Sequence, residues 1–242
     1  PFDVLQGTGL AANVLIQPNV RVGHRSMDIA VRNVQQHLHD PLLPIEYGRR
    51  LSISKHGVLA FAAQSSATLM EAAKLLELYM KTRSGSGDEF VLIERDGFVC
   101  CRLYPLDRLD ASAVSQFHIL SPIFSIETIA RWLSATHQKA VPVQMLFSFK
   151  FSHMIPEHML SPGLEVSFNQ PVNELRFHID IMQQPLSYAS PKMVSVAQAQ
   201  CEEEMQRLNT SNGVSAIIRD VIRQSEGRLP TLDQVADFIG VS

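Results

Sequence analysis

The 242-residue sequence predicts an α+β fold, in which a mixed or antiparallel sheet packs against helices and a helical region follows. Three observations support this class. A short apolar run over Val58–Ala63 has the character of a strand, and a helical pattern starts soon after it at Thr68. An Asp96-Gly97 pair separates two β-rich runs between residues 89 and 104, which is typical of a β-hairpin. From Pro191 onward the apolar residues recur at helical spacing.

Residues 57–83 are expected to form the packing nucleus. Val58–Ala63 is apolar on both faces and too short for a helix, which is typical of a strand covered on both sides of a sheet. Thr68 and Glu71 form a capping box, because the threonine can accept from the first helical turn while the glutamate reaches back to the cap. The helix then carries one apolar stripe, made of Leu69, Ala72, Ala73, Leu76 and Met80.

Further helices are predicted on both sides of the hairpin. A helix over 22–39 is ended by Asp40-Pro41, and residues 45–50 continue either as a short helix or as an extended piece. A longer helical stretch covers 111–137. Within it, Ser121-Pro122 predicts either two helices or one kinked helix.

Three more strands are predicted after residue 140. Polar and apolar residues alternate from Val141 to Lys150, and Pro142 favours an edge position because it cannot donate to a ladder. A loop with one helical turn is expected over 151–163. Val166–Phe168 and Glu174–Ile179 form the other two strands, on either side of a turn at Asn169-Gln170-Pro171.

The last fifty residues are expected to be helical. A long helix begins at Pro191 with an apolar stripe, and a shorter amphipathic helix over 214–222 is stopped by Gly227 and Pro230. Thr231–Gln234 is a second capping box, and Gly240 can adopt the left-handed conformation at a helix end. Such a turn leads a helix-turn-helix from its support helix to its recognition helix. The stripe of the long helix consists of Val194, Ala197, Cys201, Met205 and Leu208.

Composition excludes some classes of function. Hydrophobic residues make up 45% and charged residues 19%, as in ordinary globular proteins. A net charge of −3 gives no overall attraction to nucleic acid, so a DNA-binding element must be local or outside this chain. No apolar run approaches the ~18 residues of a membrane span. The start at Pro1 without a leader indicates a trimmed product rather than a secreted precursor.

Neither a catalytic nor a metal site is predicted. Three cysteines without framework spacing fit small buried side chains in a reducing cytoplasm, which predicts a cytoplasmic protein. The pairs His37/His39 and His153/His158 lack the helical spacing or cysteine partners that zinc favours. No phosphate-binding loop, nucleophile elbow or Cys-His signature occurs. We therefore expect no catalytic residue, metal or cofactor.

The closing residues, Thr231–Ser242, resemble the first helix-turn-helix of AraC/XylS-type bacterial transcription regulators, cut just before its recognition helix. The positions of its support helix and turn are Thr231, Gln234, Ala236, Gly240 and Ser242. The preceding chain is similar to one sensory-domain class of that family, which is labelled arabinose-binding but is distinct from the cupin barrel of the arabinose regulator. Ala67 departs from this class, which often has proline there. The matching segments are Gly7–Leu10, Gly57–Ala62, Ser65–Ala72, Val166–Phe168 and Asn173–Phe177.

This resemblance implies the effector-sensing and dimerisation region of a one-component regulator. The implied organisation is a ligand-sensing domain over 1–190, a connector over 191–210, and the start of a helix-turn-helix domain over 211–242. The implied partners are a small metabolite, a second copy of the chain, and promoter DNA through the full-length protein. A ligand shifts an equilibrium only by its differential affinity for two arrangements, so we expect its pocket near an interface or near the connector. The connector either contributes to the dimer contact or packs only on its own sheet.

Six residues on the predicted strands are candidates for effector contacts. An arginine among them would select an anionic ligand such as a carboxylate, through paired hydrogen bonds. The alternative is that the aromatic side chains fill the core and the arginines face water. The six candidates are Arg102, Tyr104, Phe147, Phe149, Arg176 and His178.

A second function stays open at this point. The chain could be a freestanding small-molecule-binding or adaptor protein that shares the sensory fold without binding DNA. The sequence encoded beyond Ser242 separates the two, because a regulator must continue into a recognition helix and a second helix-turn-helix of about fifty residues.

Overall fold

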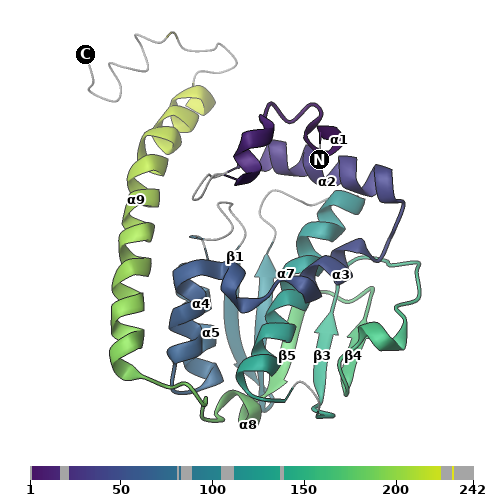
Figure 1. The fold of residues 1–242 in the computed structure, drawn as a ribbon, viewed down its shortest axis with the longest axis vertical. Coiled ribbons are helices and arrows are strands. Elements are labelled where there is room, and N and C mark those ends of the chain that lie inside the picture. Colours follow the sequence, from purple (N-terminus) through teal and green to yellow (C-terminus); the bar gives the residue numbers. More distant parts are fainter. Residues whose placement is uncertain are drawn as a thin grey trace.

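The computed structural model describes residues 2–16, 22–80, 82, 89–104, 112–136, 139–224 and 231. It confirms the α+β class: helices cover one face of a mixed sheet, and a long helix runs along one side of the molecule (Figure 1). The helices are α1 Phe2–Leu5, α2 His24–Leu38, α3 Leu43–Arg50, α4 Gly57–Ser65, α5 Leu69–Tyr79, α7 Ala113–Leu133, α8 Ile179–Met182 and α9 Pro191–Gln224. Short 3-10 turns are η1 Ala12–Ile16, η2 Ile53–His56 and η3 Glu157–Met159. The strands are β1 Glu89–Arg95, β2 Phe98–Tyr104, β3 Val143–Leu146, β4 Leu164–Ser167 and β5 Glu174–His178.

The described strands form one five-stranded sheet in the order β1-β2-β5-β3-β4. The hairpin of β1 and β2 is confirmed, and both turn residues, Asp96 and Gly97, have positive φ as a two-residue hairpin turn requires. The edge position of β3 was wrong, because β3 pairs with β5 on one side and, in parallel, with β4 on the other. Pairing starts only at Val143, so Pro142 removes no ladder hydrogen bond. The two strands flanking the Asn169–Pro171 turn exist, but β3 lies between them.

The buried strand predicted over Val58–Ala63 was wrong, because these residues lie in helix α4. This helix is covered on two sides, with Leu59 and Ala62 packed toward α9 and with Ala60 also buried. A short helix covered on both sides is apolar all round, and its sequence then lacks the one-sided stripe that marks a helix. The three alanines within it favour the helical backbone.

The capped helix that follows is confirmed as α5. The Glu71 amide donates to Thr68 Oγ1 over 3.2 Å, and Glu71 Oε2 accepts from the Ala67 amide over 2.8 Å. Two faces of α5 are covered rather than one: Leu69 belongs to the core against the sheet, while Leu75 and Tyr79 pack against α9. A single predicted stripe therefore described only half of its packing.

Helix α7 is one continuous helix with Pro122 inside it, so the two-helix alternative was wrong. Near the proline, the Ser121 hydroxyl donates to the Phe117 carbonyl over 2.8 Å. Helix α3 crosses here at very short range: a Cβ added to Gly48 would lie 2.4 Å from the Ser121 carbonyl oxygen. Glycine at this position thus permits the contact between α3 and α7.

The long helix from Pro191 is confirmed, with Ala197 and Cys201 of its apolar stripe buried against α4 and α5. It continues to Gln224 and so crosses the predicted boundary at residue 210 without interruption. Thr231 is exposed. The other predicted helix-turn-helix positions, Gln234, Ala236, Gly240 and Ser242, lie outside the described residues. In the described part of the chain, no helix combines the length and the hydropathy that crossing a membrane requires.

Candidate functional site

A cavity of about 940 Å³ lies between the helices and the sheet. Helices α4 and α5 form one wall, α7 forms the opposite wall, and the core-facing side chains of β1, β2 and β5 form the floor. Small side chains on α4 and α5 leave the space open, since alanine fills little of it. The aliphatic and aromatic lining includes Leu59, Ala60, Ala63, Leu69, Ala72, Ala73, Leu76, Met80, Phe90, Leu103, Ile126, Ile129, Leu133, Phe177 and Met182.

The two ends of the cavity differ in chemistry. The half near α8 is apolar, with Leu69, Leu133, Phe177 and Met182. The half near α2 carries the ionisable side chains. Antiparallel packing produces this division, because α4 begins where α5 ends and the first half of α7 lies beside α2 (Figure 1). The polar group near α2 consists of His24, Lys55, His56, Thr82, His118, Ser121, Glu204 and Arg207.

Contacts in this polar half fix several of its side chains. His118 Nε2 lies 2.9 Å from Asp28 Oδ1, which joins α7 to α2. Ser125 Oγ lies 3.4 Å from His56 Nε2, which joins α7 to the turn before α4. The polar end is thus assembled from five separate segments of the chain, and no local motif could have revealed it.

Helix α9 reaches the same cavity through Glu204, Arg207 and Leu208. Two residues before Glu204, Glu202 Oε2 accepts a hydrogen bond from the Tyr79 hydroxyl over 3.1 Å. Burial, and then this hydrogen bond and the charge of Glu202, raise the pKa of Tyr79, so the phenol stays protonated and keeps donating. Helix α9 therefore both lines the cavity and is hydrogen-bonded to α5, another helix of the cavity wall.

The cysteines are buried thiols, as the sequence indicated. Cys101 forms part of the cavity floor, and burial, followed by the neighbouring Cys100, raises the pKa of its thiol far above the ordinary value. A neutral thiol behaves as a small apolar side chain. Cys101 thus adds to the apolar floor.

The six candidate effector residues lie in two places rather than around one cavity. Phe147 and Phe149 are buried in the core. The remaining four lie on the opposite face of the sheet, since alternate residues of β2 and β5 point to opposite sides. The four are Arg102, Tyr104, Arg176 and His178. None of the six lines the large cavity.

On that outer face the arginines surround a buried carboxylate. Glu174 is fully buried and accepts from Arg102 Nη2 over 2.6 Å and from Arg176 Nε over 2.5 Å. Arg95 Nη2 lies 3.9 Å from the same group, and the Arg102 guanidinium also donates to the Tyr104 hydroxyl over 3.2 Å. Glu174 was not among the predicted site residues, although it lies two residues before the candidate Arg176 on the same strand. Both guanidinium groups on β2 and β5 are therefore already paired within the protein.

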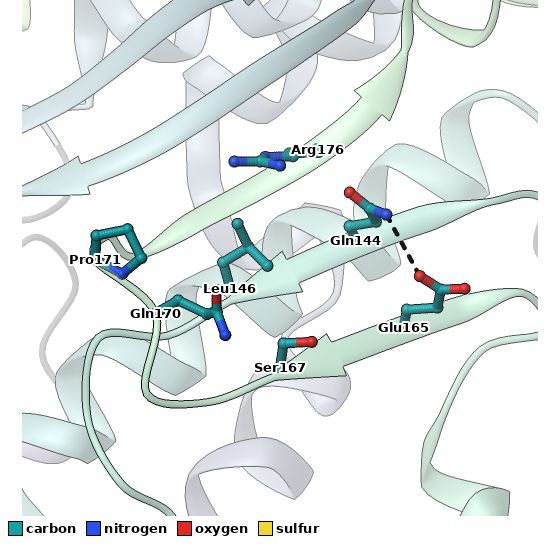
Figure 2. A pocket seen from close by; sticks show the side chains of 7 residues that line it. All are labelled: Gln144, Leu146, Glu165, Ser167, Gln170, Pro171 and Arg176. Atoms are coloured by element: carbon teal, nitrogen blue, oxygen red, sulfur yellow. Dashed lines mark hydrogen bonds between the residues drawn. The ribbon is translucent and has the colours of Figure 1, made fainter.

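Beside this cluster lies a second, smaller pocket of about 300 Å³, which Arg176 lines (Figure 2). Its other walls come from the parallel pair β3 and β4, where Gln144 Nε2 donates to Glu165 Oε2 over 3.4 Å. Of the six candidates, Arg176 lines this smaller pocket. Its ion pair with Glu174 partly neutralises the positive charge that it could offer to a ligand. Effector contact by the six residues stays a prediction.

We expect Glu174 to make stability depend on acidity. Burial alone would raise the pKa of Glu174, but the hydrogen bonds and charges of Arg176 and Arg102 outweigh it and hold the pKa below its usual 4.5. A depressed pKa stabilises the fold above pH 4.5, and that contribution is lost as the pH falls through the lowered value. Chemical denaturation of Glu174→Gln and wild type should therefore differ most above pH 4.5 and converge below it. Glu165→Gln, which changes an exposed carboxylate, is the control and should show no such convergence.

No group of three or more histidine, cysteine, aspartate or glutamate side chains is placed to hold a metal ion within the described ranges.

A protein-family model matches most of the chain. This family, described as the N-terminal arabinose-binding domain of AraC transcription regulators, matches residues 1–186. The chain belongs to this family. The resemblance predicted from Gly57–Ala72 and the later strands is thus confirmed.

Relatives of this AraC-type domain are named as transcription regulators. The chain is 26% identical over 227 residues to the ornithine utilization regulator of Pseudomonas aeruginosa, covering 92% of this chain and 64% of that protein. It is 28% identical over 246 residues to an uncharacterized HTH-type transcriptional regulator of Mycobacterium tuberculosis, covering 97% of this chain and 68% of that protein. The chain thus spans 64% to 68% of the length of these relatives.

A solved structure shares the fold. The transcriptional regulator CdpR from Pseudomonas aeruginosa superposes with a TM-score of 0.58 at 15% identity, covering 95% of this chain and 73% of that chain. At this identity the likeness concerns the fold alone. The fold of this chain therefore recurs in a solved structure of low sequence identity.

Proposed function

We propose that the chain is the effector-sensing and dimerisation region of an AraC-type regulator, and that the large cavity is its effector site. One observation carries this: α9, the helix that leads toward the predicted DNA-reading segment, forms part of the cavity wall. Family membership supports the regulatory role. Such a regulator would act in the cytoplasm, where its promoter DNA is.

Helix α4 is the element that would couple the two. Leu59 lines the cavity and also packs against Ala197 and Cys201 of α9. A ligand that displaces the α4 wall must therefore shift the surface on which α9 rests, because packed interiors transmit such displacements. The ligand would bias promoter binding by the difference in its affinity for the two positions of α9.

The outward side of α9 supports pairing of two copies along this helix. Met193 and Val196 lie one turn apart on α9 and are 37% and 49% exposed, and we expect a second copy of the chain to cover this apolar pair. We expect the 27.0 kDa chain to sediment as a dimer, and Val196→Glu to shift it to monomer. Ser195→Glu changes the neighbouring exposed position and should leave the dimer intact.

The sensing role is tested by filling the cavity. Ala73→Phe places a ring into the cavity from α5, while Lys74→Phe adds the same ring to the exposed side of the same helix. The full-length regulator is bound to its own upstream DNA, with and without the dialysable small molecules of the source cells. Wild type and Lys74→Phe should change affinity when these are added, and Ala73→Phe should not. An equal response of both variants would contradict the proposal.

A further inference from the structure

The cavity has one apolar end and one polar end, and this division indicates the kind of molecule it accepts. We infer that its ligand is an acidic amphiphile, a medium- to long-chain carboxylate, with its hydrocarbon tail toward α8 and its carboxylate toward α2. This rests on the proposed function, since it names the effector class of the same site.

The apolar half fits a hydrocarbon tail. The α5 side of the wall extends from Leu69 to Met80, about 16 Å at 1.5 Å per residue. Its far end is closed by Phe177 and Met182, with Leu133 opposite, and none of these carries a hydrogen-bonding side chain. A polar ligand buried here would lose its hydrogen bonds to water without replacement, which opposes small polar metabolites in this half. An alkyl chain would gain about fourfold in affinity for each buried CH₂ group.

The polar half fits a carboxylate. Lys55 supplies a cation that no described carboxylate pairs with within salt-bridge distance, whereas Arg207, which is 80% exposed, lies beside Glu203. Three imidazoles, those of His24, His56 and His118, also line this half, and the Nε2 atoms of His56 and His118 lie at Ser125 Oγ and Asp28 Oδ1. The Ser125 hydroxyl lies one turn further along α7 than Ser121 of the polar group. Cationic and neutral donors at one end, joined to a purely apolar end, match an anionic head on an alkyl tail.

Of the two cations that line the polar half, Lys55 is the one expected to bind the carboxylate. Arg207 lies 3.7 Å from Glu203 along α9, so part of its charge is already paired within the helix. Lys55 lies in η2, two residues before α4 begins, and lines the cavity. A head group held by Lys55 would therefore contact the segment that leads into the coupling helix.

The first experiment follows binding of hexanoate, octanoate, decanoate and dodecanoate to the intact chain, by thermal shift and calorimetry below micelle-forming concentrations. A ligand that binds the folded state raises the melting temperature. Affinity should rise about fourfold per CH₂ group until the tail fills the apolar half. Ala73→Phe should weaken dodecanoate at least tenfold, while Lys74→Phe should bind as wild type. Binding that Ala73→Phe leaves unchanged would place the carboxylate elsewhere and overturn the inference.

The second experiment tests the head group. Lys55→Met should weaken decanoate about threefold to tenfold and leave decanol unaffected, because only the carboxylate makes a charge-assisted contact. Lys74→Met removes an exposed lysine outside the cavity and should affect neither. Equal loss for the acid and the alcohol would overturn the placement of the carboxylate at Lys55.

Failure of this inference and failure of the proposed function give different results. If no carboxylate binds but a wholly polar compound does, and Ala73→Phe abolishes that binding, the amphiphile is excluded while the cavity stays the effector site. If dodecanoate binds in the cavity but the Ala73→Phe regulator still responds in the promoter assay, sensing through this cavity is excluded.

Discussion

Replacing Arg131 with alanine is expected to lower the free energy of unfolding by about 3–5 kcal/mol, because it leaves the buried Glu127 carboxylate without its main counter-charge. The side chains of Glu127 and Arg131 are 0% and 2% exposed and pair directly across one turn of α7. A second cation, Arg49 Nη1, lies 3.9 Å from Glu127 Oε2 but is itself partly exposed. Urea unfolding followed by circular dichroism measures the loss.

Arg131 also connects two parts of the fold. Its Nη1 and Nη2 atoms donate to the Lys139 and Val141 carbonyls, each over 3.2 Å, and this holds the segment that enters β3 against the end of α7. Alanine would leave both carbonyls without these donors, which adds to the cost.

The control for this change is a second glutamate–arginine pair at the same spacing. Arg50 and Glu46 pair over 2.5 Å on α3, but the arginine side chain is 77% exposed. Arg50→Ala should cost less than about 1 kcal/mol, since water screens exposed pairs. The double change Glu127→Gln/Arg131→Met should recover part of the stability lost in Arg131→Ala, because no charge is then left buried. Equal losses at Arg131 and Arg50 would contradict the burial argument.

Phe147→Ala is expected to cost about 3–5 kcal/mol, the range for truncating a fully buried aromatic side chain. The Phe147 ring lies 5.3 Å from the Phe168 ring and 6.3 Å from the Phe124 ring, centroid to centroid, so its removal opens a void between α7 and the end of β3. The loss should appear as a lower denaturation midpoint with an unchanged slope.

Tyr104→Ala provides the matched comparison, since both aromatics were candidate effector residues. Tyr104 is 40% exposed, and its truncation should cost less than about 1 kcal/mol. A similar loss at the two positions would show that the core stacking of Phe147 contributes little.

The placement of these aromatics shows where sequence reasoning reached its limit. Alternation along Val141–Lys150 predicted a half-buried strand, and the buried side of it was correct, since Val143, Met145 and Phe147 are in the core. Which strand lies beside it depends on pairing between residues far apart in sequence. The antiparallel register of β3 with β5 and its parallel register with β4 have no local signal.

Local sequence patterns could not predict the cavity, for the same reason. Its signal in the sequence was a set of small residues, Ala60, Ala63, Ala72 and Ala73, which looked like ordinary helix and core positions. Only the spacing between α4, α5 and α7 decides whether such residues close a core or border a void. The outer-face arginines were visible in the sequence, whereas their shared partner Glu174 required the β2–β5 register.

Local sequence patterns were enough to predict the α+β class, the hairpin at Asp96-Gly97, the capped start of α5 and the long helix from Pro191, and residue matches were enough to predict the family. These depend on neighbours along the chain: turn residues, caps and the period of apolar side chains. Three features required the three-dimensional packing: the helix over Gly57–Ser65, the inner position of β3, and the cavity with one polar end against α9. A helix that is buried on two sides loses the one-sided spacing of apolar residues that distinguishes a helix from a strand. A cavity depends on how far apart the packed helices and strands lie, which no local pattern encodes.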